Sequence, residues 1–259
     1  MFAQFLLFLL LPCAVRSITP CGQRPVISGD ETARVKRIAG GQPVGSARWP
    51  WQVSLRSIWS IPSCGGTIIG ARWVLTAAHC LRPGFPIEIT AGSNAINHDD
   101  TPLLEDKLAR IGLEKNKASR RPPTIRVSSS FFVFPTFDRR KSDFDIGLIE
   151  IDEPFVFDDH IQPICLPTND RVIGKETAGW LTGWGDTTAK RSPSFVLRQA
   201  EMTILDDVTC QKLYRTEDVE YRPQTMLCAG DVDGASPCRG DSGGPLMVQS
   251  SGKENATGS

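Results

Sequence analysis

Short runs rich in Val, Ile and Thr recur along most of this 259-residue chain, and turn-forming residues separate them. Runs of this kind are typical of β-strands, and few segments show helical periodicity. Closely spaced short strands predict an all-β fold, either a sandwich or a barrel. The predicted strands are Gln52–Leu55, Gly66–Ile69, Trp73–Thr76, Ile87–Ala91, Ile125–Phe134, Ile146–Ile151, Trp180–Thr182, Ser194–Ile204 and Pro245–Val248.

Two segments have helical character. Val208–Tyr214 follows the acidic pair Asp206-Asp207, which can cap the start of a helix. Leu103–Lys117 is amphipathic but basic, and it lies between polar stretches. We interpret this second segment as a loop insertion.

The chain starts with an apolar run, Met1–Leu11, followed by small residues up to Ser17. The run is too short to span a bilayer and predicts a signal peptide over residues 1–17, although no Lys or Arg precedes it. A trimmed membrane anchor is the alternative. No other segment of the sequence reaches the ~18 apolar residues of a spanning helix. We therefore expect a secreted, extracellular protein without a membrane span.

Charge and cysteine content narrow the function classes. Lys and Arg total 29 and balance 29 Asp and Glu, which argues against a general nucleic-acid-binding surface. The eight cysteines suit an oxidising compartment. Cys13 would leave with the signal peptide, and the remaining odd number leaves one cysteine without a partner. No pair has C-x-x-C spacing, so we predict neither a metal site nor a cofactor.

The strongest chemical signal is the run Gly240-Asp-Ser-Gly-Gly-Pro-Leu246. A nucleophilic serine needs a neighbouring base and backbone N–H groups directed at the developing charge. Glycines on both sides of Ser242 allow a tight turn that brings such N–H groups close. Ser242 is therefore the candidate nucleophile.

The chain has three histidines from which a base can be chosen. His79 lies in a turn of small residues after the predicted strand Trp73–Thr76, and it adjoins Cys80, so a disulfide can fix its position. His98 and His160 lie beside acidic residues and are predicted to be surface residues. His79 is therefore the candidate base.

The imidazole needs a buried carboxylate to orient it and to stabilise its protonated form. Asp145 stands at the start of an apolar strand, where a buried acid requires a partner. Asp143, two residues earlier, is the competing candidate.

With His79, Asp145 and Ser242 in this order, the chain resembles the trypsin/chymotrypsin-like serine proteases. The resemblance implies two packed six-stranded antiparallel β-barrels with the site between them. The matching motifs are Arg37–Gly41, Pro50–Leu55, Cys64–Ile68, Ala77–Cys80, Asp145–Leu148, Gln162–Pro167, Thr182–Gly185, Met226–Gly230 and Gly240–Leu246.

The resemblance also implies a role for each site residue. Ser242 would attack the peptide carbonyl and form an acyl-enzyme, and His79 would act first as general base and then as general acid. Asp145 would orient the imidazole, and the N–H groups of Gly240 and Ser242 would form the oxyanion hole. Protein or peptide substrates are expected, with serpin-type inhibitors as further partners.

The same resemblance predicts a zymogen, with a propeptide over residues 18–37 and a protease domain over 38–259. Cleavage after Arg37 would free the α-amino group of Ile38, which would pair with Asp241. The basic run Arg34-Val-Lys-Arg37 offers a cleavage site to a trypsin-like or a furin-like protease.

Three disulfides are implied by the resemblance, and they would leave Cys238 unpaired. Gly179 and Val248 occupy the positions where the family often has a further bridge. The implied pairs are Cys64–Cys80, Cys210–Cys228 and Cys21–Cys165.

Two departures from the family pattern bear on activity. Ser236 occupies the base of the specificity pocket, where an Asp would select Lys or Arg, so we expect a preference for bulky apolar residues. After Val248 the strands and terminal helix of the family are missing, so we expect an incomplete second barrel with an open edge. The alternative function is therefore a catalytically impaired secreted homologue that acts as a binding protein.

The segment between His79 and Asp145 is long and charged. We expect a solvated, protease-sensitive loop, and a basic exosite for heparin or an acidic protein is the alternative. A calcium site is a further alternative, but the EF-hand spacing is missing. Asn255-Ala-Thr257 is an N-glycosylation sequon. The basic residues are Lys107, Arg110, Lys115, Lys117, Arg120, Arg121 and Arg126, and the acidic residues are Asp99, Asp100, Glu105 and Asp106.

Overall fold

The computed structural model describes ten segments of the chain: residues 20–25, 41–45, 47–57, 64–96, 123–167, 177–187, 193–214, 221–230, 237–250 and 253–258. Several sequence-based expectations fall outside these segments. They concern the signal peptide, Arg37, Ile38, His98, Leu103–Lys117, Ser236 and the charged residues between positions 97 and 122. Arg126, the last of the basic residues named above, is within the described residues.

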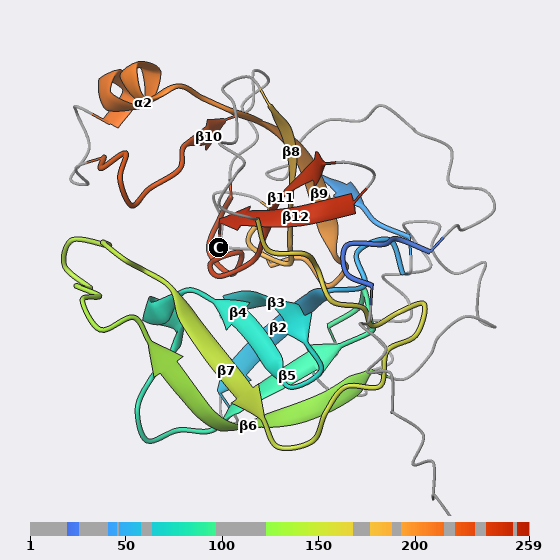
Figure 1. The fold of residues 1–259 in the computed structure, drawn as a ribbon. Helices are drawn as coiled ribbons and strands as arrows, with labels where there is room; N and C mark the ends of the chain where they lie inside the picture. The colour runs from blue at the N-terminus through green and yellow to red at the C-terminus, as the bar shows by residue number, and fades with distance from the viewer. Residues whose placement is uncertain are drawn as a thin grey trace, which may run out of the picture.

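Six antiparallel strands close into a barrel in the order β2-β3-β4-β7-β6-β5 (Figure 1). Buried and partly exposed positions alternate along β5 and β7, as expected for strands with one face on a core. The strands are β2 (Gln52–Ser57), β3 (Cys64–Gly70), β4 (Trp73–Thr76), β5 (Ile87–Ala91), β6 (Thr124–Val133) and β7 (Gly147–Ile151).

A second sheet runs in the order β1-β9-β8-β11-β12, with β10 paired to the other end of β9. This sheet is open within the described residues. Figure 1 shows it stacked against the barrel, so the molecule has two β lobes. The strands are β1 (Gln42–Pro43), β8 (Ala178–Gly183), β9 (Arg198–Ile204), β10 (Ala229–Gly230), β11 (Leu246–Ser250) and β12 (Lys253–Gly258).

Helices are short in the described part of the chain, and none has the length and hydropathy needed to cross a bilayer. The 3₁₀ turn η1 (Ala78–Cys80) follows β4. The helix α2 (Asp207–Tyr214) follows β9, and Asp206 caps it by accepting hydrogen bonds from the N–H and the hydroxyl of Thr209. The helix and its acidic cap agree with the sequence-based prediction.

The predicted all-β, chymotrypsin-like class is confirmed, and every predicted strand is present with bounds that differ by a few residues. Three strands were not predicted: β1, β10 and β12. Within the described residues the edge strands of the second sheet are β1 and β12, and β12 has the polar sequence Lys253–Gly258 and low β-propensity. Its pairing with β11, with Val248 opposite Asn255, places this segment in the sheet.

Three disulfides join distant parts of the described chain: Cys21–Cys165, Cys64–Cys80 and Cys210–Cys228. These are the pairs that the family resemblance implies. Cys238 has a free thiol. The Cys64–Cys80 bridge ties β3 to η1, and the Cys210–Cys228 bridge ties α2 to the segment before β10.

Where the two lobes meet, buried side chains and backbone groups bond across what we call the lobe junction. The indole N–H of Trp51 lies 2.9 Å from the sulfur of Met247, and both side chains are fully buried. The backbone N–H of Gly65 donates to the carbonyl oxygen of Ser242 at 2.8 Å. These contacts fix the barrel against the turn before β11.

Candidate active site

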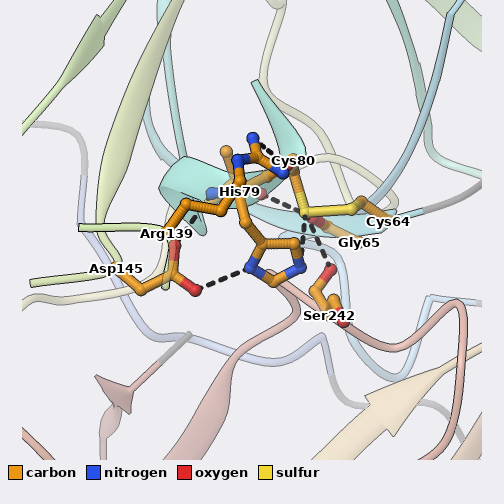
Figure 2. The surroundings of a disulfide bond; sticks show 8 residues. Cys64, Gly65, His79, Cys80, Arg139, Asp145 and Ser242 are labelled. Atoms are coloured by element: carbon orange, nitrogen blue, oxygen red, sulfur yellow. Dashed lines mark hydrogen bonds and ion pairs between the residues drawn. A yellow bond between two sulfur atoms is a disulfide. The ribbon is translucent and has the colours of Figure 1, made fainter. Parts of the chain in front are cut away.

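The structure brings His79, Asp145 and Ser242 together at the lobe junction. His79 lies in η1 and Asp145 directly before β7, so both belong to the barrel, whereas Ser242 lies in the turn before β11. Figure 2 shows the imidazole between Asp145 on one side and Ser242 on the other. Each candidate therefore comes from a different strand end, and the two lobes supply them jointly.

Two contacts join His79 to Asp145. Asp145 Oδ2 lies 2.6 Å from Nδ1 of the imidazole, and Oδ1 accepts the backbone N–H of His79 at 2.8 Å. Partial burial alone would raise the pKa of Asp145, but the hydrogen bonds from His79 outweigh it and hold that pKa below its ordinary value. The carboxylate is therefore ionised at neutral pH and fixes the ring orientation.

Within the described residues Asp143, the competing candidate, has contacts with Thr225 and Arg222 and no hydrogen bond or ion pair with the imidazole. Its Oδ1 accepts the hydroxyl of Thr225 at 2.6 Å, and its Oδ2 lies 3.4 Å from the guanidinium of Arg222. Asp145 is thus the carboxylate that the structure places against His79.

Ser242 is held by its backbone. Its carbonyl oxygen accepts the N–H of Gly65 and lies 3.6 Å from Sγ of Cys80, and this sulfur lies 3.7 Å from Nε2 of His79. The Cys64–Cys80 disulfide thus touches both halves of the site (Figure 2). Within the described residues the Ser242 hydroxyl makes no hydrogen bond. Hydrogen bonds between a catalytic serine and its base are often long or poorly aligned before a substrate binds.

The turn around Ser242 leaves several backbone N–H groups, including those of Gly240, Ser242 and Gly243, without an acceptor in the described chain. Within the turn, the N–H of Asp241 donates to Cys238 and that of Gly244 to Asp241. The N–H groups of Gly240 and Ser242 have no acceptor among the described residues. Gly240 has a φ of +100°, which side-chain-bearing residues rarely adopt.

Gly243 has no room for a side chain. Its φ is +79°, and a Cβ there would overlap Oγ1 of Thr76 and lie 2.7 Å from the carbonyl oxygen of Gly65. The turn can therefore approach the barrel as closely as it does only because residue 243 is glycine.

Asp241 is buried next to Ser242, with only 3% of its surface exposed. Its carboxylate accepts the N–H groups of Gly185 at 2.7 Å and of Cys238 at 2.9 Å. Burial raises the pKa of Asp241 above its ordinary value, and the nearby carboxylate of Asp186 adds to this rise. In the part of the chain that the structure describes, no cationic side chain pairs with it.

Cys64, His79 and Cys80 also form a close cluster of potential metal ligands. Both sulfur atoms are bonded to each other, so neither is available as a thiolate. The cluster therefore does not have the donors of a zinc site.

His160, another of the histidines considered as a base, is half-buried in a turn, where its backbone N–H donates to the carboxylate of Asp158. The guanidinium of Arg139 donates to the carbonyl oxygen of His79 at 3.1 Å, a contact that no local sequence pattern predicts. The contact of Gly65 with Ser242 was also not predicted, although Gly65 lies in one of the matched motifs.

Two β lobes with a serine, an imidazole and a carboxylate at their junction are the arrangement of a serine-type peptidase. Comparison with protein-family models supports this class, because the trypsin model matches residues 38–258. The match covers most of the chain. The chain therefore belongs to the trypsin family of serine proteases.

The crowding at Gly243 can be tested by comparison with Gly84, which has a similar φ of +85° but no atom near the position of a Cβ. We expect Gly84→Ala to lower the free energy of unfolding by about 1–2 kcal/mol through backbone strain alone. Gly243→Ala should lower the free energy of unfolding by about 1–3 kcal/mol more than Gly84→Ala does, because it overpacks the lobe junction. Urea unfolding measures both changes.

Hydrogen exchange at the N–H of Gly65 locates the effect. Its protection should fall by more than the loss of global stability in Gly243→Ala, and by no more than that loss in Gly84→Ala. Equal losses of stability, with no such additional loss of protection at Gly65 in Gly243→Ala, would contradict the crowding argument.

Proposed function

We propose that this protein is a secreted serine endopeptidase that hydrolyses peptide bonds through an acyl-enzyme. The observation that carries the proposal is the 2.6 Å contact between Nδ1 of His79 and Oδ2 of Asp145, with Ser242 on the opposite side of the same ring. A carboxylate in this position keeps Nε2 free to accept a proton from the serine hydroxyl.

In the proposed reaction, Oγ of Ser242 bonds to the substrate carbonyl carbon while Nε2 of His79 takes the hydroxyl proton. The N–H groups of Gly240 and Ser242 stabilise the negative charge on the carbonyl oxygen. The C–N bond then breaks as His79 gives its proton to the leaving amine. Water attacks the resulting ester by the same route in reverse, which releases the acid and restores Ser242.

Activation by cleavage after Arg37 is the second part of the proposal. Asp241 supports it, since this buried carboxylate has two N–H donors but no cationic partner in the described chain. A buried charge without a counter-charge is costly. The new α-amino group of Ile38 would supply that charge, and a trypsin-like or furin-like protease would make the cut.

The proposed location and specificity rest on other features. Three disulfides favour an oxidising compartment, which suits a secreted protein with a signal peptide over residues 1–17. Ser236 at the proposed pocket base carries no charge, so substrates with large apolar residues before the scissile bond are expected. Protein or peptide substrates and serpin-type inhibitors follow from the family.

The activation step can be tested by treating the chain with a trypsin-like protease and following turnover of a peptide ester. Cleavage after Arg37, verified by N-terminal sequencing that begins at Ile38, should start turnover. Arg37→Gln should remain inactive, whereas Arg34→Gln, the matched control in the same basic run, should be activated normally. Ser242→Ala should remove activity. Full activity of uncut Arg37→Gln would contradict the zymogen proposal.

Specificity can be tested with a peptide library and the activated protein. The unaltered chain should prefer large apolar residues before the scissile bond. Ser236→Asp should raise kcat/KM for Lys and Arg by about 100-fold, because a carboxylate at the pocket base pairs with the cation. A preference for Lys or Arg in the unaltered chain would overturn the assignment of Ser236.

A further inference from the structure

The carboxylate that faces His79 lies at the end of an irregular turn between β6 and β7. Ser142 and Phe144, with φ of +51° and +54°, both lie in the left-handed region that side chains other than Gly rarely adopt. The N–H of Ile146 donates to the carbonyl oxygen of Phe144 at 2.8 Å. Such a conformation persists only where neighbouring contacts hold it.

One set of those contacts comes from the other lobe. Asp143 accepts the hydroxyl of Thr225 at 2.6 Å and lies 3.4 Å from the guanidinium of Arg222. Thr225 and Arg222 belong to the segment between α2 and β10, which Figure 1 shows on the same side of the molecule as the β6–β7 turn. We call this contact the Asp143 bridge.

The Asp143 bridge is shielded from solvent. The side chains of Asp143 and Arg222 are 19% and 26% exposed, so water screens their attraction less than it does for a surface pair. The hydrogen bond joins residues 82 positions apart in the sequence. It therefore links the turn to the second lobe rather than to its own neighbours.

Only Phe144 separates the bridge from Asp145. The ring of Phe144 stacks on that of Phe134, with centroids 5.1 Å apart and planes 5° from parallel. Because only this one residue separates Asp143 from Asp145, we expect a displacement of Asp143 to move the backbone of Asp145 as well. The carboxylate of Asp145 must meet two N–H groups of His79 at once, so it tolerates little displacement.

We propose that Asp143 is a positioning residue, which holds Asp145 against His79 by joining the β6–β7 turn to Thr225 and Arg222 of the second lobe. The proposal rests on the proposed peptidase function. It gives a role to the acid that lies two residues before Asp145 and contacts the second lobe instead of His79. Because Ser242 belongs to the second lobe, the bridge also places both partners of His79 relative to the same lobe.

Kinetics of the activated protein test the proposal. Asp143→Ala should lower kcat by about 10–100-fold with KM nearly unchanged, because misplacement of reacting groups by about 1 Å has effects of this size. Thr225→Val should also lower kcat, whereas Thr225→Ser, which keeps the hydroxyl, should have the kcat of the unaltered protein. Asp159→Ala, which removes an exposed acid from the same lobe, is the matched control and should leave kcat unchanged.

The double variant Asp143→Ala/Thr225→Val shows whether the two residues act through one bond. Its loss of kcat should then be no larger than that of Asp143→Ala alone. A kcat for Asp143→Ala equal to that of the control, or a change confined to KM, would overturn the proposal.

A spectroscopic measurement separates this proposal from the proposed function. In a Ser242→Ala background, the proton between Nδ1 of His79 and Asp145 should give a far-downfield NMR signal. Asp143→Ala should broaden or shift this signal, while Asp143→Asn, whose amide oxygen still accepts from Thr225, should largely preserve it. An unaltered signal in Asp143→Ala refutes the positioning role whether or not the protein hydrolyses peptides.

Discussion

The hydrogen bond from the N–H of Gly65 to the carbonyl oxygen of Ser242 joins the two lobes at the point where the site is assembled. His79 comes from one lobe and Ser242 from the other, so their relative position depends on how closely the lobes approach. Gly243 permits that approach because a side chain there would overlap Thr76. The buried contact between Trp51 and Met247 holds the same junction from the core side.

The carboxylate side of the site is held in a different way. Asp145 stands at the end of a turn whose backbone is strained at Ser142 and Phe144. Hydrogen bonds to His79 hold Asp145 at the β7 end of this turn, and Asp143, two residues earlier, contacts Thr225 and Arg222 of the second lobe. The site therefore depends on the contacts at the lobe junction and on the contacts that hold this turn. Asp241, which is buried next to Ser242, is the carboxylate with which the α-amino group of Ile38 would pair in the proposed activation.

The sequence predicted much of this arrangement, because local patterns determine the parts concerned. Val/Ile/Thr-rich runs predicted the long strands, and the glycines around Ser242 predicted a tight turn. Patterns could not predict β12, whose polar residues join the sheet only by pairing with β11. They favoured Asp145 over Asp143 as the partner of His79, but the contacts of Asp143 with the second lobe are tertiary and had no local signal. The partners Thr225 and Arg222 lie too far along the chain for any local signal.

In the proposed function, His79 and Ser242 act as one unit across the lobe junction. Labelling with a fluorophosphonate, followed by peptide mass spectrometry, can detect this unit, since the reagent bonds to a serine whose hydroxyl is activated by a base. In the chain cleaved after Arg37 we expect one adduct, on Ser242, and its loss in His79→Ala. Equal labelling of Ser242 in His79→Ala, or no adduct in the cleaved chain, would show that the two residues do not act together.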